Sequence, residues 1–214
     1  MTTTGSERVL HSFGTGSDGS FPDAGLRDVN GTLYGTTESG GSSNHGTVYR
    51  VSTTGAEKVL HSFAGGSDGA QPIADLINVG GMLYGTTWQG GGSYGSGTVY
   101  RISTAGVEKV LYSFAGGLDG ALPEAGLINV NGTLYGTTID GGAFHESAGY
   151  GTIYSVTTTG SEKVLHRFAG GSDGSQPAAG LINLKGILYG TTSVGGITQK
   201  CLYHSCGIVF ALSR

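Results

Sequence analysis

The sequence is poor in cysteine, proline, tryptophan and charged side chains. Its 214 residues include two cysteines, four prolines and one tryptophan, and only 12% of the side chains are charged. Eleven Lys and Arg against fifteen Asp and Glu give a net charge of −4, with no basic cluster, which argues against nucleic acid as a partner. No apolar run approaches the roughly 20 residues of a membrane helix, so we expect no membrane insertion.

Motifs of named enzyme and cofactor classes are also missing. No nucleophile elbow, phosphate-binding loop or His-Glu-x-x-His motif supports a particular chemistry, so we expect no cofactor and no metal. The first residues, Met1 to Thr4, do not form a signal peptide. An export signal could have been removed from the chain before them.

Glycine, by contrast, is abundant, and it is periodic. The sequence has 43 glycines, and the run Leu33 to Thr37 returns as Leu83 to Thr87, Leu134 to Thr138 and Leu188 to Thr192. The tyrosines of these runs are 50, 51 and 54 residues apart. Periods of this size are typical of propellers or of solenoids built from supersecondary units.

Each repeat divides into four strand-like runs and shows no helical periodicity. In the second repeat the runs are Leu76 to Val79, Met82 to Thr87, Thr98 to Ser103 and Glu108 to Phe114. The first two are joined by Gly80-Gly81, a connection typical of a tight β-hairpin turn. We therefore predict an all-β protein.

The two ends of the chain predict a closed ring. The sequence begins inside a repeat and finishes, at Gly207 to Leu212, where the missing piece would follow. We predict a single domain, a four-bladed β-propeller with four antiparallel strands per blade, in which the N-terminal strand completes the last blade and leaves no unpaired edge between the first and last blades. The predicted blades are about 24–63, 74–114, 125–168, and 179–214 together with 1–13. We expect a monomer; the alternative is a dimer in which two chains pair into an eight-bladed ring.

The motifs resemble a known repeat. The run Leu-Tyr-Gly-Thr-Thr-x-x-Gly-Gly, followed by Gly-Thr-Val-Tyr, Val-Leu-His-Ser-Phe and Asp-Gly-x-x-Pro, is similar to the GloVer tandem repeat of exported bacterial proteins over essentially the whole chain. The resemblance implies an extracellular or cell-envelope location and implies no catalytic residues. The repeat is also distantly similar to kelch blades, although the tryptophan of a kelch fourth strand is absent here.

The connections after the Thr-Thr pairs vary most and hold most of the unusual side chains. They contain 8, 9, 12 and 14 residues, and variable loops on a rigid scaffold commonly carry recognition. Aromatic side chains beside polar ones suit stacking on a sugar ring. The alternative is that they only pack loop against loop. The candidate binding residues are His45, Trp88, Tyr94, Asp140, His145, Tyr150 and His204.

The two cysteines lie in the longest of these connections. Cys201 and Cys206 are predicted to form a disulfide in an oxidising compartment. A metal site with His204 is the alternative, but it lacks a paired Cys-x-x-Cys signature and an obvious fourth ligand.

Acidic residues break the symmetry after the loop prolines. Asp23, Asp75 and Glu124 are predicted to cluster at the mouth of the central channel, with Arg27 pairing with Asp75. Two carboxylates in one cleft can act as acid and base on a glycosidic bond, and solvated loop charges are the alternative. His145, Glu146 and Tyr150 are the other catalytic candidates.

Features that recur in the repeats are expected to be structural. The Asp-Gly pairs begin at Asp18, Asp68, Asp119 and Asp173, and an Asp that caps its own turn recurs with the turn. The outer-strand residues His11, His61 and His166 have Tyr112 as their fourth equivalent, which suits an aromatic-sized slot.

Three functions follow as hypotheses. The first is a binding module that recognises an extracellular glycan or cell-surface polymer through one face of variable loops. The second is a polysaccharide lyase or glycoside hydrolase with a site on the same face. The third is a structural repeat without a small ligand.

Overall fold

The computed structural model describes residues 5–14, 16–92, 94–142, 149–196 and 206–213, and these residues form an all-β protein. Their only helical segments are three short 3-10 turns in the loops between sheets, Gly66–Asp68, Gly117–Asp119 and Gly171–Asp173. Within the described part of the chain, no helix is long and apolar enough to cross a membrane.

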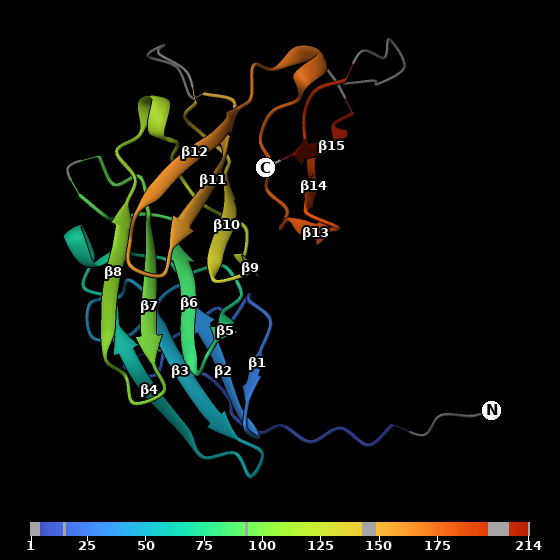
Figure 1. Cartoon of the computed structure of the whole chain (residues 1–214). Coiled ribbons are helices and arrows are strands. Elements are labelled where there is room, and N and C mark those ends of the chain that lie inside the picture. Colours follow the sequence, from blue (N-terminus) through green and yellow to red (C-terminus); the bar gives the residue numbers. More distant parts are fainter. Residues whose placement is uncertain (1–4, 15, 93, 143–148, 197–205, 214) are drawn as a thin grey trace.

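The strands form four separate antiparallel sheets, in sequence order within each sheet, arranged like propeller blades (Figure 1). Blade 1 contains β1 (Arg27–Val29), β2 (Thr32–Thr37), β3 (Thr47–Ser52) and β4 (Glu57–Ser62). Blade 2 contains β5 (Ile77–Val79), β6 (Met82–Thr87), β7 (Thr98–Ser103) and β8 (Glu108–Ser113). Blade 3 contains β9 (Ile128–Val130), β10 (Thr133–Thr138), β11 (Thr152–Thr157) and β12 (Glu162–Arg167). Blade 4 contains β13 (Ile182–Leu184), β14 (Ile187–Thr192) and β15 (Ile208–Ser213).

The predicted hairpin turns are present between the first two strands of each blade. In blade 1, Asn30 and Gly31 have φ values of 52° and 80°, a left-handed pair that asparagine and glycine adopt easily. The side chain of Asp28 accepts a hydrogen bond from Gly31 N at 2.9 Å. Asn78 and Asn129 brace the next two turns in the same way.

The Leu-Tyr-Gly-Thr-Thr run is explained by close packing inside each blade. Gly85 lies opposite Tyr100 across the β6–β7 pair, and a Cβ at Gly85 would lie 2.6 Å from the tyrosine Oη. The second threonine, Thr87, is fully buried and shares a 2.8 Å hydrogen bond with Thr98 Oγ1. The run therefore recurs because the glycine admits an aromatic ring and the threonine satisfies buried polar groups.

The core lies between blades. Phe63 at the end of blade 1 packs edge-on against Tyr100 of blade 2, with ring centroids 5.1 Å apart. Phe114 meets Tyr154, and Phe168 meets Phe210, at the next two junctions. The innermost strands of consecutive blades also touch: β1 with β5, β5 with β9, and β9 with β13.

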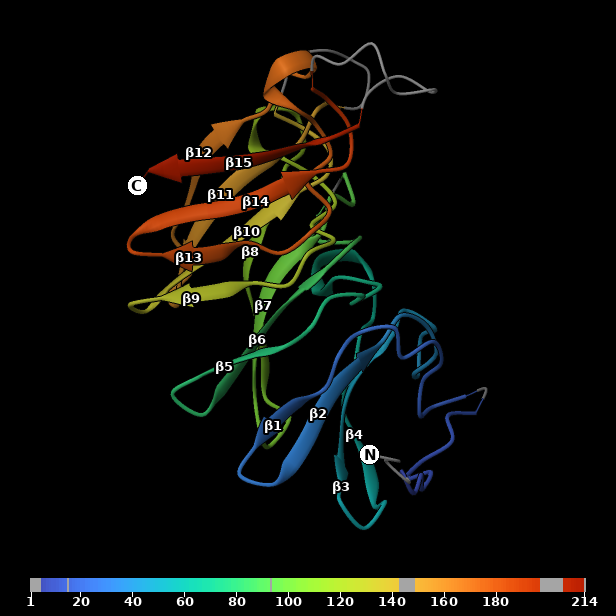
Figure 2. The same ribbon diagram turned by 90° about the vertical axis from the view of Figure 1, so that its right-hand side faces the viewer.

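The structure does not show the closed ring that the two ends of the chain predicted. Residues 5–14 form no strand, and they pack on blade 1, where Phe13 meets the Tyr49 ring at 4.8 Å. Among the described residues, blade 4 has three strands rather than the predicted four. The blades spread along an open arc, so that blade 1 and blade 4 lie apart (Figures 1 and 2).

Candidate functional site

A backbone bridge in each repeat brings two variable positions together. Trp88, directly after the Thr-Thr pair, donates its N–H to the carbonyl of Gln71, which has a φ of 56°. Pro72 and Ile73 follow Gln71 in the crossing loop, which is the segment that joins the last strand of one blade to the first strand of the next. In the first repeat Glu38 makes the equivalent bond to Phe21, two residues before Asp23. The residue after Thr-Thr and the residue after the loop proline thus share one face of the molecule.

These positions line a pocket of about 450 Å³. Its lining residues come from all four repeats and are Asp23, Glu38, Ile73, Trp88, Glu124 and Ala178. A neighbouring hollow of about 380 Å³ shares four of these residues and adds Arg27 and Asp75. The predicted acidic residues Asp23, Asp75 and Glu124 therefore line one continuous region, together with Trp88.

Within the pocket, the polar side chains are only partly engaged. Trp88 is half-buried, and its Nε1 is buried without a hydrogen-bond partner among the described residues. Gln71 Nε2 donates to Glu38 Oε1 at 3.2 Å, which holds this carboxylate beside the tryptophan's loop. Glu38 was not among the candidates from the sequence, although it occupies the same repeat position as Trp88.

The predicted ion pair between Arg27 and Asp75 is not among the ion pairs of the described residues. Arg27 Nε donates instead to the carbonyl of Leu76 at 2.9 Å, and Asp75 accepts a hydrogen bond from Gly25 N. Each side chain bonds to the backbone of a neighbouring blade. Arg27 and Asp75 therefore make two separate contacts between blades 1 and 2 instead of pairing with each other.

The other described candidates, His45, Tyr94, Asp140 and Tyr150, are not among the residues that line this pocket. The His45 ring lies over Gly65, and the Tyr150 ring lies over Gly170. The backbone carbonyls of His45 and Tyr150 accept hydrogen bonds from backbone N–H groups of the crossing loops. Tyr94 is 81% exposed. Asp140 is half-buried, and its burial raises the pKa of the carboxyl group.

Four candidates lie outside the described residues: His145, Glu146, Cys201 and His204. Cys206 is disulfide-bonded. Its pairing with Cys201 stays a prediction.

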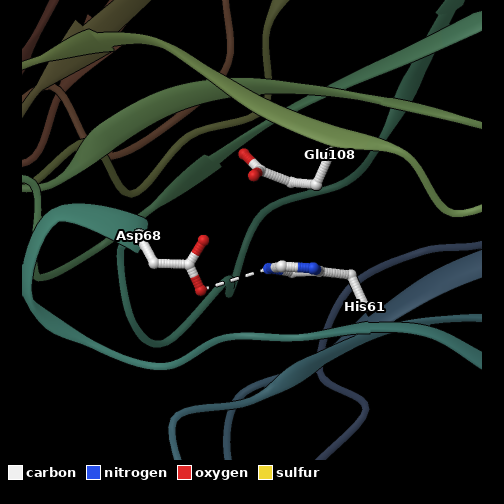
Figure 3. Close-up of side chains that lie close together, drawn as sticks. All are labelled: His61, Asp68 and Glu108. Carbon is white, nitrogen blue, oxygen red and sulfur yellow. Dashed lines mark hydrogen bonds and ion pairs between the residues drawn. The ribbon is translucent and has the colours of Figure 1, made fainter.

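A second cluster of titratable groups recurs where consecutive blades meet. In Figure 3, His61 at the end of β4 and Asp68 from the crossing loop face Glu108 from β8 of the next blade. His61 Nε2 lies 3.2 Å from Asp68 Oδ2, and Ala64 N donates to the same carboxylate at 2.7 Å. The Asp-Gly pairs are thus structural, as predicted, because the aspartate closes its own loop.

Among the described residues, His61, Asp68 and Glu108 form the group whose possible metal-ligand atoms lie close enough together to share a cation. These atoms are within 4.8 Å of one another. At the next junction the histidine is replaced by Tyr112, whose hydroxyl donates to Asp119 Oδ1 at 2.6 Å. A phenol and an imidazole can both bond to a carboxylate, but only the imidazole is a common metal ligand. The repeated feature is therefore a junction bracket: an outer-strand His or Tyr bonded to the loop aspartate, beside a glutamate of the next blade.

Burial changes the acidity of the glutamates in these brackets. Burial, and then the Asp68 charge, raises the pKa of Glu108 from its ordinary value of 4.5 to about 7. Burial and the Asp119 charge raise the pKa of Glu162 to about 7 as well. One carboxylate oxygen of each glutamate is buried without a hydrogen-bond partner among the described residues.

We expect the free energy of unfolding to fall as the pH rises from about 5 to above 7. In the unfolded chain, Glu108 and Glu162 lose their protons near the ordinary value of 4.5, whereas the folded chain keeps them until about 7. The folded state binds more protons between these values, so raising the pH favours unfolding, and the loss is complete above about 7. Urea unfolding measured between pH 5 and 8.5 tests this.

The matched variant is Glu108→Gln combined with Glu162→Gln, which keeps the side-chain shape and removes the titration. Its free energy of unfolding should vary less with pH. An equal slope in both proteins would show that other groups cause the dependence.

Comparison with solved structures gives likenesses at low sequence identity. The chain is similar to Bacteroides ovatus xyloglucan PUL GH43B, with 13% identity over 92% of this chain and 40% of that chain, and a TM-score of 0.49. It is similar to the phage phi92 endosialidase, with 14% identity, 89% and 35% coverage, and a TM-score of 0.48. It is also similar to the α-L-arabinofuranosidase CtGH43 of Clostridium thermocellum, with 15% identity, 92% and 70% coverage, and a TM-score of 0.42.

The chain spans less than half the length of the first two of these structures. No curated protein matches the chain.

The family comparison agrees with the repeat motifs. The model of the Gloeobacter/Verrucomicrobia repeat matches residues 1–204, nearly the whole chain. The four Leu-Tyr-Gly-Thr-Thr runs all lie within the matched range. The chain belongs to the Gloeobacter/Verrucomicrobia repeat family.

Proposed function

We propose that this chain is a carbohydrate-binding module whose site is the pocket around Trp88. The observation that carries the proposal is that one pocket is lined by the only tryptophan and by three carboxylates, Asp23, Glu38 and Glu124. An aromatic side chain offers an apolar surface to a sugar ring, and carboxylates accept hydrogen bonds from its hydroxyl groups. A glycan or cell-surface polymer is thus the proposed partner.

The charge of the site selects among glycans. Arg27 is the one cationic side chain lining the two hollows among the described residues, against four carboxylates that include Asp75. Its guanidinium already bonds to the Leu76 carbonyl. An acidic sugar would meet uncompensated negative charge, so we propose neutral or amino sugars as ligands.

The location proposed for this module is outside the cell or in the cell envelope. Glycan polymers are exposed there, and a disulfide at Cys206 persists in such oxidising surroundings.

Tryptophan fluorescence tests the binding proposal, because Trp88 is the only tryptophan and lines the pocket. Titration with neutral oligosaccharides such as xylo-, cello- and chito-oligomers should change its emission with saturation. Uronic-acid oligomers of equal length should bind at least about tenfold more weakly because of like-charge repulsion. Preferential binding of the acidic oligomers would contradict the proposed site.

A glycoside-cleaving enzyme is the second candidate, because Asp23 and Glu124 line both hollows. Two carboxyl groups in one cleft can supply the acid and the base or nucleophile of glycoside hydrolysis. Reducing-sugar release from the same oligosaccharides, lost in Glu124→Gln, would establish the enzyme. Binding without product release supports the module.

A further inference from the structure

The outer face of blade 4 is uncovered, although the same face is buried in the other blades. Val209 of β15 is 78% exposed, and Ile182 and Leu184 of β13 are 63% and 56% exposed. The counterparts of Val209 in blades 1 to 3 are at most 1% exposed, and they are Val48, Val99 and Ile153. In those blades the next blade covers this face, so blade 4 lacks a neighbour of the same kind.

At the opposite end of the arc, blade 1 already carries one strand-like segment that belongs to a preceding blade. Phe13 packs edge-on against Tyr49, as Phe63, directly after β4, packs against Tyr100. A Cβ on Gly55 would meet the carbonyl of Leu10 at 2.6 Å, just as one on Gly106 would meet that of Leu60 at 2.7 Å. Residues 7–13 thus lie against blade 1 as β4 lies against blade 2.

No described residue takes the place of the other strands of that preceding blade. Leu26 of blade 1 is 51% exposed, whereas its counterparts Leu76 and Leu127, each covered by a preceding blade, are 1% and 3% exposed. The two ends of the arc therefore present the two halves of one blade junction, and these two ends lie apart in space within a single chain (Figures 1 and 2).

We propose that two copies of this chain join end to end, each supplying residues 7–13 as the fourth strand of the other's blade 4. The apolar face of Ile182, Leu184 and Val209 would then pack against blade 1 of the second copy. Because the contact is head to tail, a ring of two copies makes it twice and leaves neither end of the arc uncovered.

The register of this pairing follows from the complete blades. In blade 1, β3 pairs with β4 so that Val48 faces His61 and Val51 faces Glu57. The equivalent pairs place Val209 opposite His11 and Leu212 opposite Glu7 of the second copy. The first residue of the fourth strand is a glutamate in every complete blade. These residues are Glu57, Glu108 and Glu162 in blades 1 to 3.

The same register completes a junction bracket. His166 Nε2 and Asp173 Oδ2 share a hydrogen bond at 3.1 Å, but no glutamate of a following outer strand faces them among the described residues. Their side chains are 34% and 37% exposed, against 21% and 23% for His61 and Asp68, which face Glu108. Glu7 of the second copy would take the place that Glu108 holds in blade 2.

Analytical ultracentrifugation of the whole chain at micromolar concentration tests this proposal. The native protein should have twice the mass of one chain. Val209→Glu places a charge in the centre of the contact and should weaken association by about 30-fold or more, giving the mass of one chain. Leu184→Glu is a second, independent disruption of the same face.

Val107→Glu is the matched control, because Val107 is 72% exposed in the β7–β8 turn, away from both ends of the arc. It should leave the two-chain mass unchanged. Circular dichroism should show native strand content in all three variants, since each position is exposed in the single chain.

A native mass of one chain at every concentration would overturn the proposal, including the case in which residues 7–13 close the ring within their own chain. A mass above two copies would overturn the two-copy ring. A two-chain mass that persists in both Val209→Glu and Leu184→Glu would show that the chains associate through another surface.

Discussion

Replacing Gly85 with alanine is expected to lower the melting temperature by about 6–12 °C. The added Cβ would lie 2.6 Å from Tyr100 Oη and 2.8 Å from its Cζ, and 3.0 Å from Leu76 Cδ2. Tyr100 and Leu76 are buried, so neither side chain can swing into solvent. Overpacking of a core commonly costs about 1–3 kcal/mol, and we expect about 3 kcal/mol here, which corresponds to this shift in a domain of about 200 residues.

The control for this experiment is Gly80→Asn in the β5–β6 turn. Gly80 has a φ of 61° and nothing within 4 Å of an added Cβ, and Asn30 and Asn131 occupy the equivalent positions at 52° and 54°. The melting temperature of this variant should stay within about 2 °C of the native value, because asparagine tolerates the left-handed region. If Gly85→Ala melted equally close to the native protein, the packing explanation of the repeated glycine would be wrong.

The second large effect is expected in Trp88→Ala, which should weaken oligosaccharide binding by about 30- to 100-fold. Removing a central aromatic anchor from a binding site commonly costs about 2–3 kcal/mol. Because Trp88 is also the fluorescent reporter, the affinity of the variant has to be measured by isothermal titration calorimetry. Trp88→Phe keeps an aromatic surface and should retain part of the affinity.

Tyr94→Ala provides the comparison for Trp88→Ala. Tyr94 is an exposed aromatic residue of the same connection, and it is not among the residues that line the pocket. Its removal should leave the affinity unchanged. Equal losses in Trp88→Ala and Tyr94→Ala would place the binding surface on the loop exterior rather than in the pocket.

The repeats made the architecture predictable. The fourfold run with its tyrosines, the Asn-Gly turns and the β-rich runs specified the strands and their order within each blade. These signals are local, because a turn residue or a strand run acts on its immediate neighbours. The one predicted strand not observed among the described residues is the N-terminal strand, whose predicted partner lies more than 190 residues away in the sequence.

The candidate site was only partly predictable for the same reason. Asp23, Trp88 and Glu124 stood out because they break the repeat, but the sequence assigned Trp88 to the variable loops and the two acids to the channel mouth. The bridges from Trp88 N to Gln71 O and from Glu38 N to Phe21 O put both sets into one pocket. Glu38 was missed, because a single acidic residue at a variable position has no distinctive pattern.

By itself, the sequence determined the period, the all-β class, the four sheets and the family, since each of these follows from the residue order of a repeat and from its recurrence along the chain. Only the tertiary structure decided how the repeats meet. It joined Trp88 to the acidic residues, placed Glu108 against His61 and Asp68, and left blade 4 with an uncovered face. Those contacts depend on the angle between successive sheets, which packing across the junctions sets and no single repeat encodes.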